Sequence, residues 1–333
     1  MKKTIIVTLL ASLMLSGCAE NNVTSSTNVP ERIDFKWISP TGNVAVSFYD
    51  QGENENWTTS VAEMIRPQLL VNAYDAIVFD GVAGLTVLGA NPNANYVFAD
   101  WISEGTFYLV STKHTSADAF DSSYTIDAFV QGGNASKAFR SLTGSWGWEL
   151  GEGAVTYEDG APTVLANIIG ADAYDYYVLA EPAITNAKAR LAAAGKTLNI
   201  VYNLQEEWAK YHDGATIPAG GLFINKKVYS DDRYKFWMDD FIAQVHARLD
   251  TAIENPAKVK EVLDEYEAIN PDSDTDTATR FGITGALVYN LETNGNKLGL
   301  LKSGTIKDNK AFADSFSTLT GGKEFSESLF YTK

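Results

Sequence analysis

Residues 159–225, DGAPTVLANIIGADAYDYYVLAEPAITNAKARLAAAGKTLNIVYNLQEEWAKYHDGATIPAGGLFIN, set the architecture of this chain. Short apolar runs alternate here with helical segments. The pattern predicts strands at 175–179, 198–202 and 222–225, and helices at 162–169, 183–194 and 204–211. Pro162 lies in the first turn of one helix and Gly195 closes another, as helix ends prefer. Strands that alternate with helices favour an α/β fold with mainly parallel sheets.

The flanking sequence continues this pattern toward the N-terminus and changes it toward the C-terminus. Apolar runs predict further strands at 32–38, 74–79, 106–111 and 124–130. After residue 231 the pattern becomes helical, with helices expected near 231–254 and 256–268. We therefore expect a helical C-terminal third that packs back onto an earlier sheet.

Four loops share one property, since each directly follows an apolar strand and is rich in Gly, Pro, Ser, Asn or acid. They are residues 39–42, 80–81, 131–136 and 180–182. Ligands of open α/β sheets bind beyond the carboxyl ends of strands, so these loops predict a binding cleft. The candidate ligand-binding residues are Trp37, Ser39, Thr41, Asp80, Gly81, Gly132, Gly133, Asn134, Ala135 and Glu181.

A specific resemblance accompanies the loops. The segments DYYVLAEPAITNAK (175–188), LNIVYNLQEEWAKYHDG (198–214) and IPAGGLFINKK (217–227) resemble the substrate-binding proteins of ABC importers. The similarity is greatest to the branch for nitrate, sulfonates, taurine and the pyrimidine precursor of thiamine. It includes the acid-proline pair Glu181-Pro182 and the return segment Pro218–Gly221, and it spans most of residues 31–255.

This resemblance implies a two-lobed type II periplasmic-binding-protein fold, with two mainly parallel sheets flanked by helices and a cleft between the lobes. Lobe one would comprise 31–112 and 222–333, and lobe two 113–221, with crossovers near Thr112 and at 218–221. A receptor of this kind closes on its ligand by hinge motion. The expected partners are a small-molecule ligand and an ABC permease with its ATPase, and we expect a monomer with no cofactor and no catalytic activity.

Two alternatives remain at this point. One is a sulfonate- or nitrate-type anion receptor of the same fold, because helix N–H groups at Asn134–Ser136 could hold an anion. The other is an enzyme of the same fold, similar to pyrimidine synthases or menaquinone-pathway members. Asp80 and Glu181 would face the cleft from opposite lobes, and the four loops contain no Lys or Arg. The two carboxylates favour a neutral or cationic nitrogenous ligand, held between aromatic faces such as Trp37 or Tyr108. This preference does not hold if Glu181 only caps its own helix.

Cys18 is the only cysteine of the chain. Lys2 and Lys3 precede an apolar stretch, 5–15, that is too short for a stable membrane span. The run that ends at Cys18, LSGC, resembles a bacterial lipobox, which implies cleavage before Cys18 and acylation of its thiol. We therefore expect a lipoprotein signal at 1–17, a flexible tether at 18–30 and an extracytoplasmic, membrane-anchored protein. The alternative is an ordinary signal peptide with a chance cysteine.

The charge and the histidine spacing of the chain argue against nucleic acid binding and against a metal site. The formal charge of −16 disfavours nucleic acid as a partner. His114, His212 and His246 do not have the spacing of a helical zinc site, so we expect no metal. Trp146 and Trp148 could form a stacking platform for a ligand or could pack against a sheet edge.

Overall fold

The computed structural model describes residues 34–117, 120–230, 232–272, 274–294 and 297–332. Cys18, the expected signal at 1–17 and the expected tether at 18–30 lie outside the described residues. Within the described ranges, no helix combines the length and the apolar character needed to cross a membrane.

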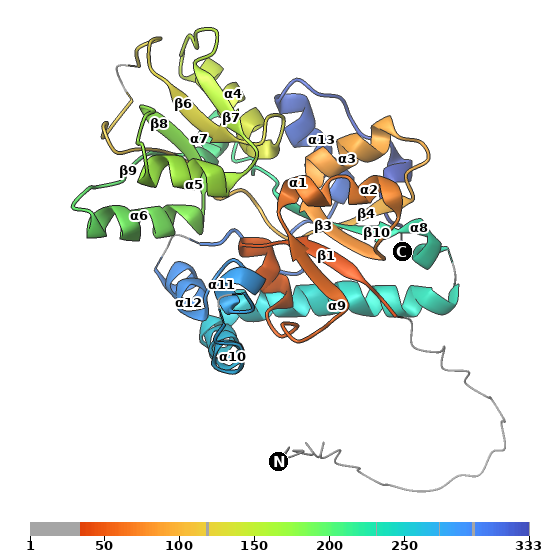
Figure 1. Ribbon diagram of the computed structural model, residues 1–333. Coiled ribbons are helices and arrows are strands. Elements are labelled where there is room, and N and C mark those ends of the chain that lie inside the picture. The colour runs from red at the N-terminus through yellow and green to blue at the C-terminus, as the bar shows by residue number, and fades with distance from the viewer. Residues whose placement is uncertain (1–33, 118–119, 231, 273, 295–296, 333) are drawn as a thin grey trace, which may run out of the picture. The chain divides into compact units, whose positions relative to one another are not determined.

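Two five-stranded sheets organise the chain (Figure 1). The first sheet has the order β2 (Trp57–Ser60), β1 (Trp37–Pro40), β3 (Ala76–Asp80), β10 (Gly220–Asn225), β4 (Tyr96–Trp101). The second has the order β7 (Val155–Glu158), β6 (Ile126–Phe129), β8 (Tyr176–Ala180), β5 (Phe107–Ser111), β9 (Asn199–Asn203). In each sheet the fourth strand, β10 or β5, runs antiparallel to both neighbours, and the remaining pairs are parallel. Both sheets therefore share one plan, and the expected mainly parallel α/β architecture is confirmed.

Helices surround both sheets. The helices that follow strands of the first sheet are η1 (Asn43–Phe48), α1 (Ala62–Ile65), α2 (Gln68–Val71), α3 (Gly81–Ala90) and α8 (Lys226–Tyr229). Those that follow strands of the second are α4 (Asn134–Ser145), α5 (Ala161–Ile169), α6 (Ala183–Ala193) and α7 (Leu204–Tyr211). The C-terminal third adds α9 (Asp232–Glu254), α10 (Pro256–Ile269), α11 (Thr277–Arg280), α12 (Gly285–Thr293), α13 (Asn309–Leu319) and η2 (Glu327–Leu329).

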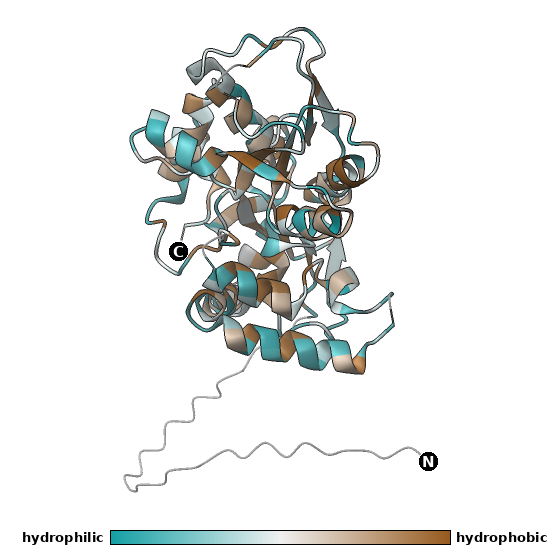
Figure 2. Ribbon diagram, turned by 90° about the vertical axis from the view of Figure 1, so that its left-hand side faces the viewer, coloured by the Kyte–Doolittle hydropathy of each residue, from teal (hydrophilic) through white to brown (hydrophobic). Residues whose placement is uncertain are grey.

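The long helix α9 packs beneath the first sheet, as expected for the C-terminal third (Figure 1). Met238, Ile242, Val245 and Leu249 are buried at a spacing of three to four residues, which places them on one face of the helix. Figure 2 shows hydrophobic and hydrophilic residues interspersed along the helices at the surface of the protein. Burial of that apolar stripe is the main force that fixes α9 against the sheet.

The chain passes between the sheets in two adjacent segments. The outgoing crossover is 102–106, because β5 already pairs with β8 and β9 of the second sheet. The expected crossover near Thr112 is therefore placed too late. The return crossover is 212–219, and its Pro218 forms an antiparallel bridge with Glu104. The N–H of Gly105 also donates to the carbonyl of Ile217 at 2.8 Å.

Candidate functional site

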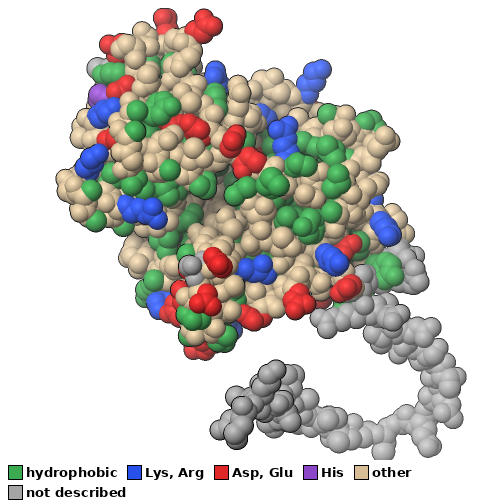
Figure 3. All heavy atoms as spheres, in the orientation of Figure 1, with side chains coloured by type: hydrophobic (Ala, Val, Ile, Leu, Met, Phe, Trp, Pro, Cys, Tyr) green, Lys and Arg blue, Asp and Glu red, His purple; other side chains and the backbone are tan. Residues whose placement is uncertain are grey.

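A cavity of about 370 Å³ lies between the two sheets. It is lined by the loops that follow β1, β2 and β3 of the first sheet and β6, β7 and β8 of the second, together with both crossovers. Figure 3 shows this face hollowed between the elements of the two sheets, with acidic and hydrophobic side chains at the rim. The site thus lies beyond the carboxyl ends of three parallel strands from each sheet, where such folds bind ligands.

Six of the ten candidate residues line this cavity and four do not. The lining ones are Thr41, Asp80, Gly133, Asn134, Ala135 and Glu181. Trp37, Ser39, Gly81 and Gly132 are not among the residues that line it. Tyr108, suggested as an aromatic face, is instead buried in the core of the second sheet.

The excluded residues have structural partners of their own. The ring of Trp37 packs against Phe48 and Phe241 at centroid distances of 5.9 and 5.4 Å. Ser39 is fully buried, and its hydroxyl accepts a hydrogen bond from Trp57 Nε1 at 3.0 Å. Strand alternation points each of these side chains away from the cleft, although both residues lie next to it in sequence.

Gly81 and Gly132 have structural roles that depend on the lack of a side chain. A Cβ at Gly81 would lie 2.1 Å from the ring of Trp101, so the absence of a side chain permits helix α3 to approach β4. Gly132 has φ +80°, a left-handed conformation that favours glycine in the turn before α4.

Asp80 links the two sheets. Its Oδ1 accepts a hydrogen bond from the N–H of Ala83 at 2.9 Å and caps α3. Its Oδ2 accepts from the N–H of Asn134, the first residue of α4, at 3.0 Å. Burial raises the pKa of the Asp80 carboxyl, although these two hydrogen bonds and nearby Lys137 oppose the shift. The helix start at which the sequence suggests an anion seat is therefore occupied by the protein's own carboxylate.

Glu181 has a capping contact and a free oxygen. Its side chain is 2% exposed, and Oε2 accepts a hydrogen bond from the N–H of Thr185 in α6 at 3.1 Å. Oε1 is buried with no hydrogen-bond partner. Burial raises the pKa of the Glu181 carboxyl, since the charged form loses its water, while the Thr185 N–H and Lys188 partly oppose this. Capping alone does not account for this side chain.

Two further acids, Glu63 and Glu104, line the cavity and were missed by the sequence analysis. Glu63 lies on α1, and its Oε1 is buried without a partner. A Cβ at Gly160, at the start of α5, would lie 3.3 Å from that oxygen, so the carboxylate of Glu63 reaches an element of the second sheet. Glu104 lies on the outgoing crossover, and burial raises the pKa of its carboxyl.

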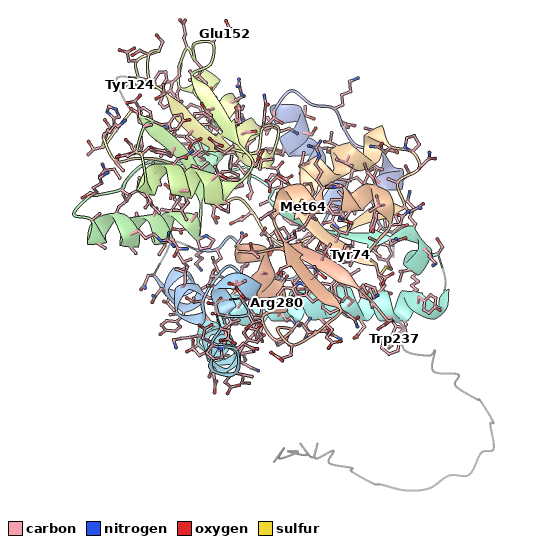
Figure 4. The ribbon with its side chains drawn as sticks, in the orientation of Figure 1. Met64, Tyr74, Tyr124, Glu152, Trp237 and Arg280 are labelled. Carbon is pink, nitrogen blue, oxygen red and sulfur yellow. The ribbon has the colours of Figure 1, made fainter. Side chains whose placement is uncertain are left out.

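The rest of the cavity wall is mainly apolar. Phe79 on β3 of the first sheet and Phe107 and Phe129 on β5 and β6 of the second belong to this wall. Among the described residues that line the cavity, none is Lys, Arg or His. Arg280 is labelled in Figure 4. Its guanidinium donates hydrogen bonds to three backbone carbonyls at and just before β2 of the first sheet, those of Gly52, Asn54 and Trp57. The cavity therefore combines apolar walls with acceptor groups.

Trp146 and Trp148 pack at a distance from this cavity and do not line it. The ring of Trp148 stacks on Phe120 at a centroid distance of 4.0 Å, and that of Trp146 stacks on Tyr202 at 4.5 Å. Trp146 Nε1 also donates to Glu207 at 2.9 Å. Packing at the sheet edge accounts for both tryptophans.

Comparisons with known proteins identify the fold. No protein-family model and no curated protein matches the sequence. Solved structures do match. An ABC transporter protein from Parabacteroides distasonis has a TM-score of 0.60 at 16% identity, over 90% of this chain and 99% of that chain. The ligand-binding component of an ABC-type import system from Staphylococcus aureus, with zinc bound, has a TM-score of 0.63 at 8% identity, over 90% and 96%. The periplasmic aliphatic sulphonate-binding protein of Escherichia coli has a TM-score of 0.60 at 8% identity, over 91% and 93%.

These matches cover nearly the whole described chain with the same arrangement of two helix-flanked sheets. The chain therefore has the fold of the periplasmic binding proteins, of type II. At such low identities the likeness concerns the fold, and the ligand has to be argued from the cavity of this chain.

Proposed function

We propose that this protein is an extracytoplasmic solute-binding lipoprotein that delivers a small organic ligand to an ABC importer without altering it chemically. The observation that carries this proposal is the cavity between the sheets, lined by the carboxyl ends of strands from both. Its volume of about 370 Å³ falls in the range of small-molecule sites. The fold shared with solved ABC-transporter binding proteins supports the same function.

The two sheets are the cores of two lobes in this proposal, with the lobe boundaries moved to the crossovers 102–106 and 212–219. Closure is a hinge rotation about these paired segments. Asp80 contributes to the closed form, because its carboxylate accepts hydrogen bonds from elements on both sides of the cleft. The permease and its ATPase then recognise the closed receptor, which acts as a monomer held to the membrane through Cys18.

A nitrogenous compound, such as a vitamin precursor with ring or amino N–H groups, fits this cavity better than a sulfonate or nitrate. An anion in a buried site needs cationic or N–H donors to offset its lost hydration. The N–H of Asn134 is already bonded to Asp80, and no basic side chain is among the described lining residues. Acceptors that lack partners suit a ligand that supplies donors.

A thermal-shift screen of metabolites tests the function. A ligand present at 100 times its Kd adds about 2.7 kcal/mol to the free energy of unfolding and raises Tm accordingly. We expect one or a few chemically related nitrogenous metabolites to do so. If no metabolite binds while incubation with the protein converts one into a product, the chain is an enzyme of this fold and not a receptor.

A further inference from the structure

We propose that the ligand carries a positive charge, on an ammonium or amidinium group that the carboxylates of Glu63 and Glu181 hold from opposite sides of the cavity. This inference rests on the proposed function and deepens it by assigning the charge of the ligand and the residues that select it.

The first argument is the set of acceptors without partners. Glu181 Oε1, Glu63 Oε1 and Asn134 Oδ1 are all buried and accept no hydrogen bond within the described chain. Glu181 and Asn134 are 2% and 1% exposed, and all three residues line the cavity. Buried acceptors normally have partners, because a lost hydrogen bond to water is not otherwise replaced. Three such acceptors around one cavity indicate that the bound ligand supplies the donors.

The second argument is charge. Glu104 and Asp80 line the same cavity, so that four carboxyl groups surround it and no basic side chain does among the described lining residues. Lys137 opposes the raised pKa of Asp80 and Lys188 that of Glu181, yet neither lysine forms a salt bridge with its acid in the part of the chain that the structure describes. Burial already disfavours the ionised form of Glu181, and a neutral ligand would satisfy the acceptors but would leave that cost in place. A cation supplies both donors and charge, and charge-assisted hydrogen bonds are the stronger kind.

The third argument is placement. Glu63 comes from α1 beside the first sheet, and Glu181 comes from the end of β8 in the second. Glu63 also lies against Gly160 across the cleft. Approach of the two sheets brings negative groups together, which opposes closure when the cavity is empty. A cation between Glu63 and Glu181 removes that repulsion, so that closure depends on the charge of the ligand.

The walls define the rest of the ligand. Phe79, Phe107 and Phe129 are among the lining residues, and an apolar, aromatic wall suits a compact apolar or aromatic body next to the charged group. The ligand class is therefore a small organic amine or amidine and not a bare inorganic cation.

A matched series of probes tests this directly. Benzylammonium, benzyl alcohol and phenylmethanesulfonate share one body and differ in charge, and their binding to the full-length protein can be measured by calorimetry and thermal shift. We expect benzylammonium to bind at least about tenfold more tightly than benzyl alcohol, as one charge-assisted contact allows, and phenylmethanesulfonate not to bind. In Glu181→Gln the preference for the cation should fall below about threefold.

The controls make each result decisive. Glu152→Gln makes the same chemical change on an exposed loop of the second sheet (Figure 4) and should retain the preference. Glu63→Gln provides a second test of the same preference if Glu181→Gln does not fold. The inference is overturned if the neutral or anionic probe binds as tightly as the cation, if none of the three binds, or if Glu181→Gln keeps the preference. A neutral or anionic metabolite that closes the protein would also overturn it while the receptor function stands.

Discussion

At the scale of single residues, Asp80 and Glu181 look alike in the sequence and differ in the structure. Each ends an apolar strand and precedes a helix. Both oxygens of Asp80 accept backbone N–H groups, one from each side of the cleft. Glu181 uses one oxygen for Thr185 and leaves the other without a partner. The distinction depends on which backbone N–H groups the fold brings to each carboxylate, and no local sequence pattern contains that information.

Glu181 should therefore make the unliganded protein less stable as pH rises. Burial raises the pKa of its carboxyl in the folded chain, so folding favours the protonated form. The stability from this group is present below its ordinary pKa and is lost as pH rises through the raised value. We expect the Tm of Glu181→Gln to rise relative to the parent as pH increases above the ordinary glutamate pKa of about 4.3. Thermal unfolding without ligand measures this difference, and Glu152→Gln should show none. A Tm that stays below that of the parent as pH increases would make Glu181 a structural cap only.

At the scale of elements, helix α3 depends on glycine at its contact with the first sheet. A Cβ at Gly84 would lie 2.2 Å from the ring of Phe223 on β10. A Cβ at Gly89, on the same helix, would lie 3.6 Å from Leu329, which is an ordinary contact. The helix thus approaches the sheet closely at one glycine and not at the other, and this approach fixes the start of α3 at the cavity.

These two glycines form a matched pair for a stability measurement. Gly84→Ala overpacks the contact with Phe223 and should lower the free energy of unfolding by about 1–3 kcal/mol. Gly89→Ala gains helix propensity and should leave it unchanged or raise it by up to about 1 kcal/mol. Chemical denaturation of both variants gives the comparison. Equal effects at the two positions would mean that α3 does not pack on β10 in this way.

The helices and strands of this chain show how far the sequence alone predicts the fold. Regular alternation identified β8, α6, β9 and α7 almost to the residue, because each is bounded by Gly, Pro or Asn. Helix α3 was not predicted, since three glycines in ten residues hide its helical pattern. Strands β2 and β7 have four residues each and are half exposed, so neither presents an apolar run.

Two omissions at the site, Glu63 and Gly160, follow from those missed strands. Glu63 follows β2 and Gly160 follows β7, so both were absent from the loops that the sequence analysis selected. Trp37 and Ser39 were selected by position in the chain, but alternation along β1 buries their side chains in the core. The sequence therefore located the cleft, and the tertiary structure was needed to decide which side chains line it.

At the scale of the whole molecule, the proposed membrane anchor depends on Cys18, which lies outside the described residues. A thiol acylated at this position would hold the mature protein to the membrane by more than one acyl chain. We expect Cys18→Ser to remain unprocessed or to be shed, with the mass of the unacylated chain. Mass spectrometry and membrane fractionation of cells that express the variant and the parent check this. Identical masses and identical membrane fractions would exclude lipidation at Cys18.

The central claim is that two lobes close around a small ligand. Small-angle X-ray scattering of the full-length protein, with and without a saturating metabolite from the thermal-shift screen, tests it most directly. Hinge rotation about the crossovers 102–106 and 212–219 predicts a smaller radius of gyration when the ligand is bound. A radius of gyration that stays the same at saturation would contradict closure and, with it, the assignment of this chain as a hinge-closing receptor.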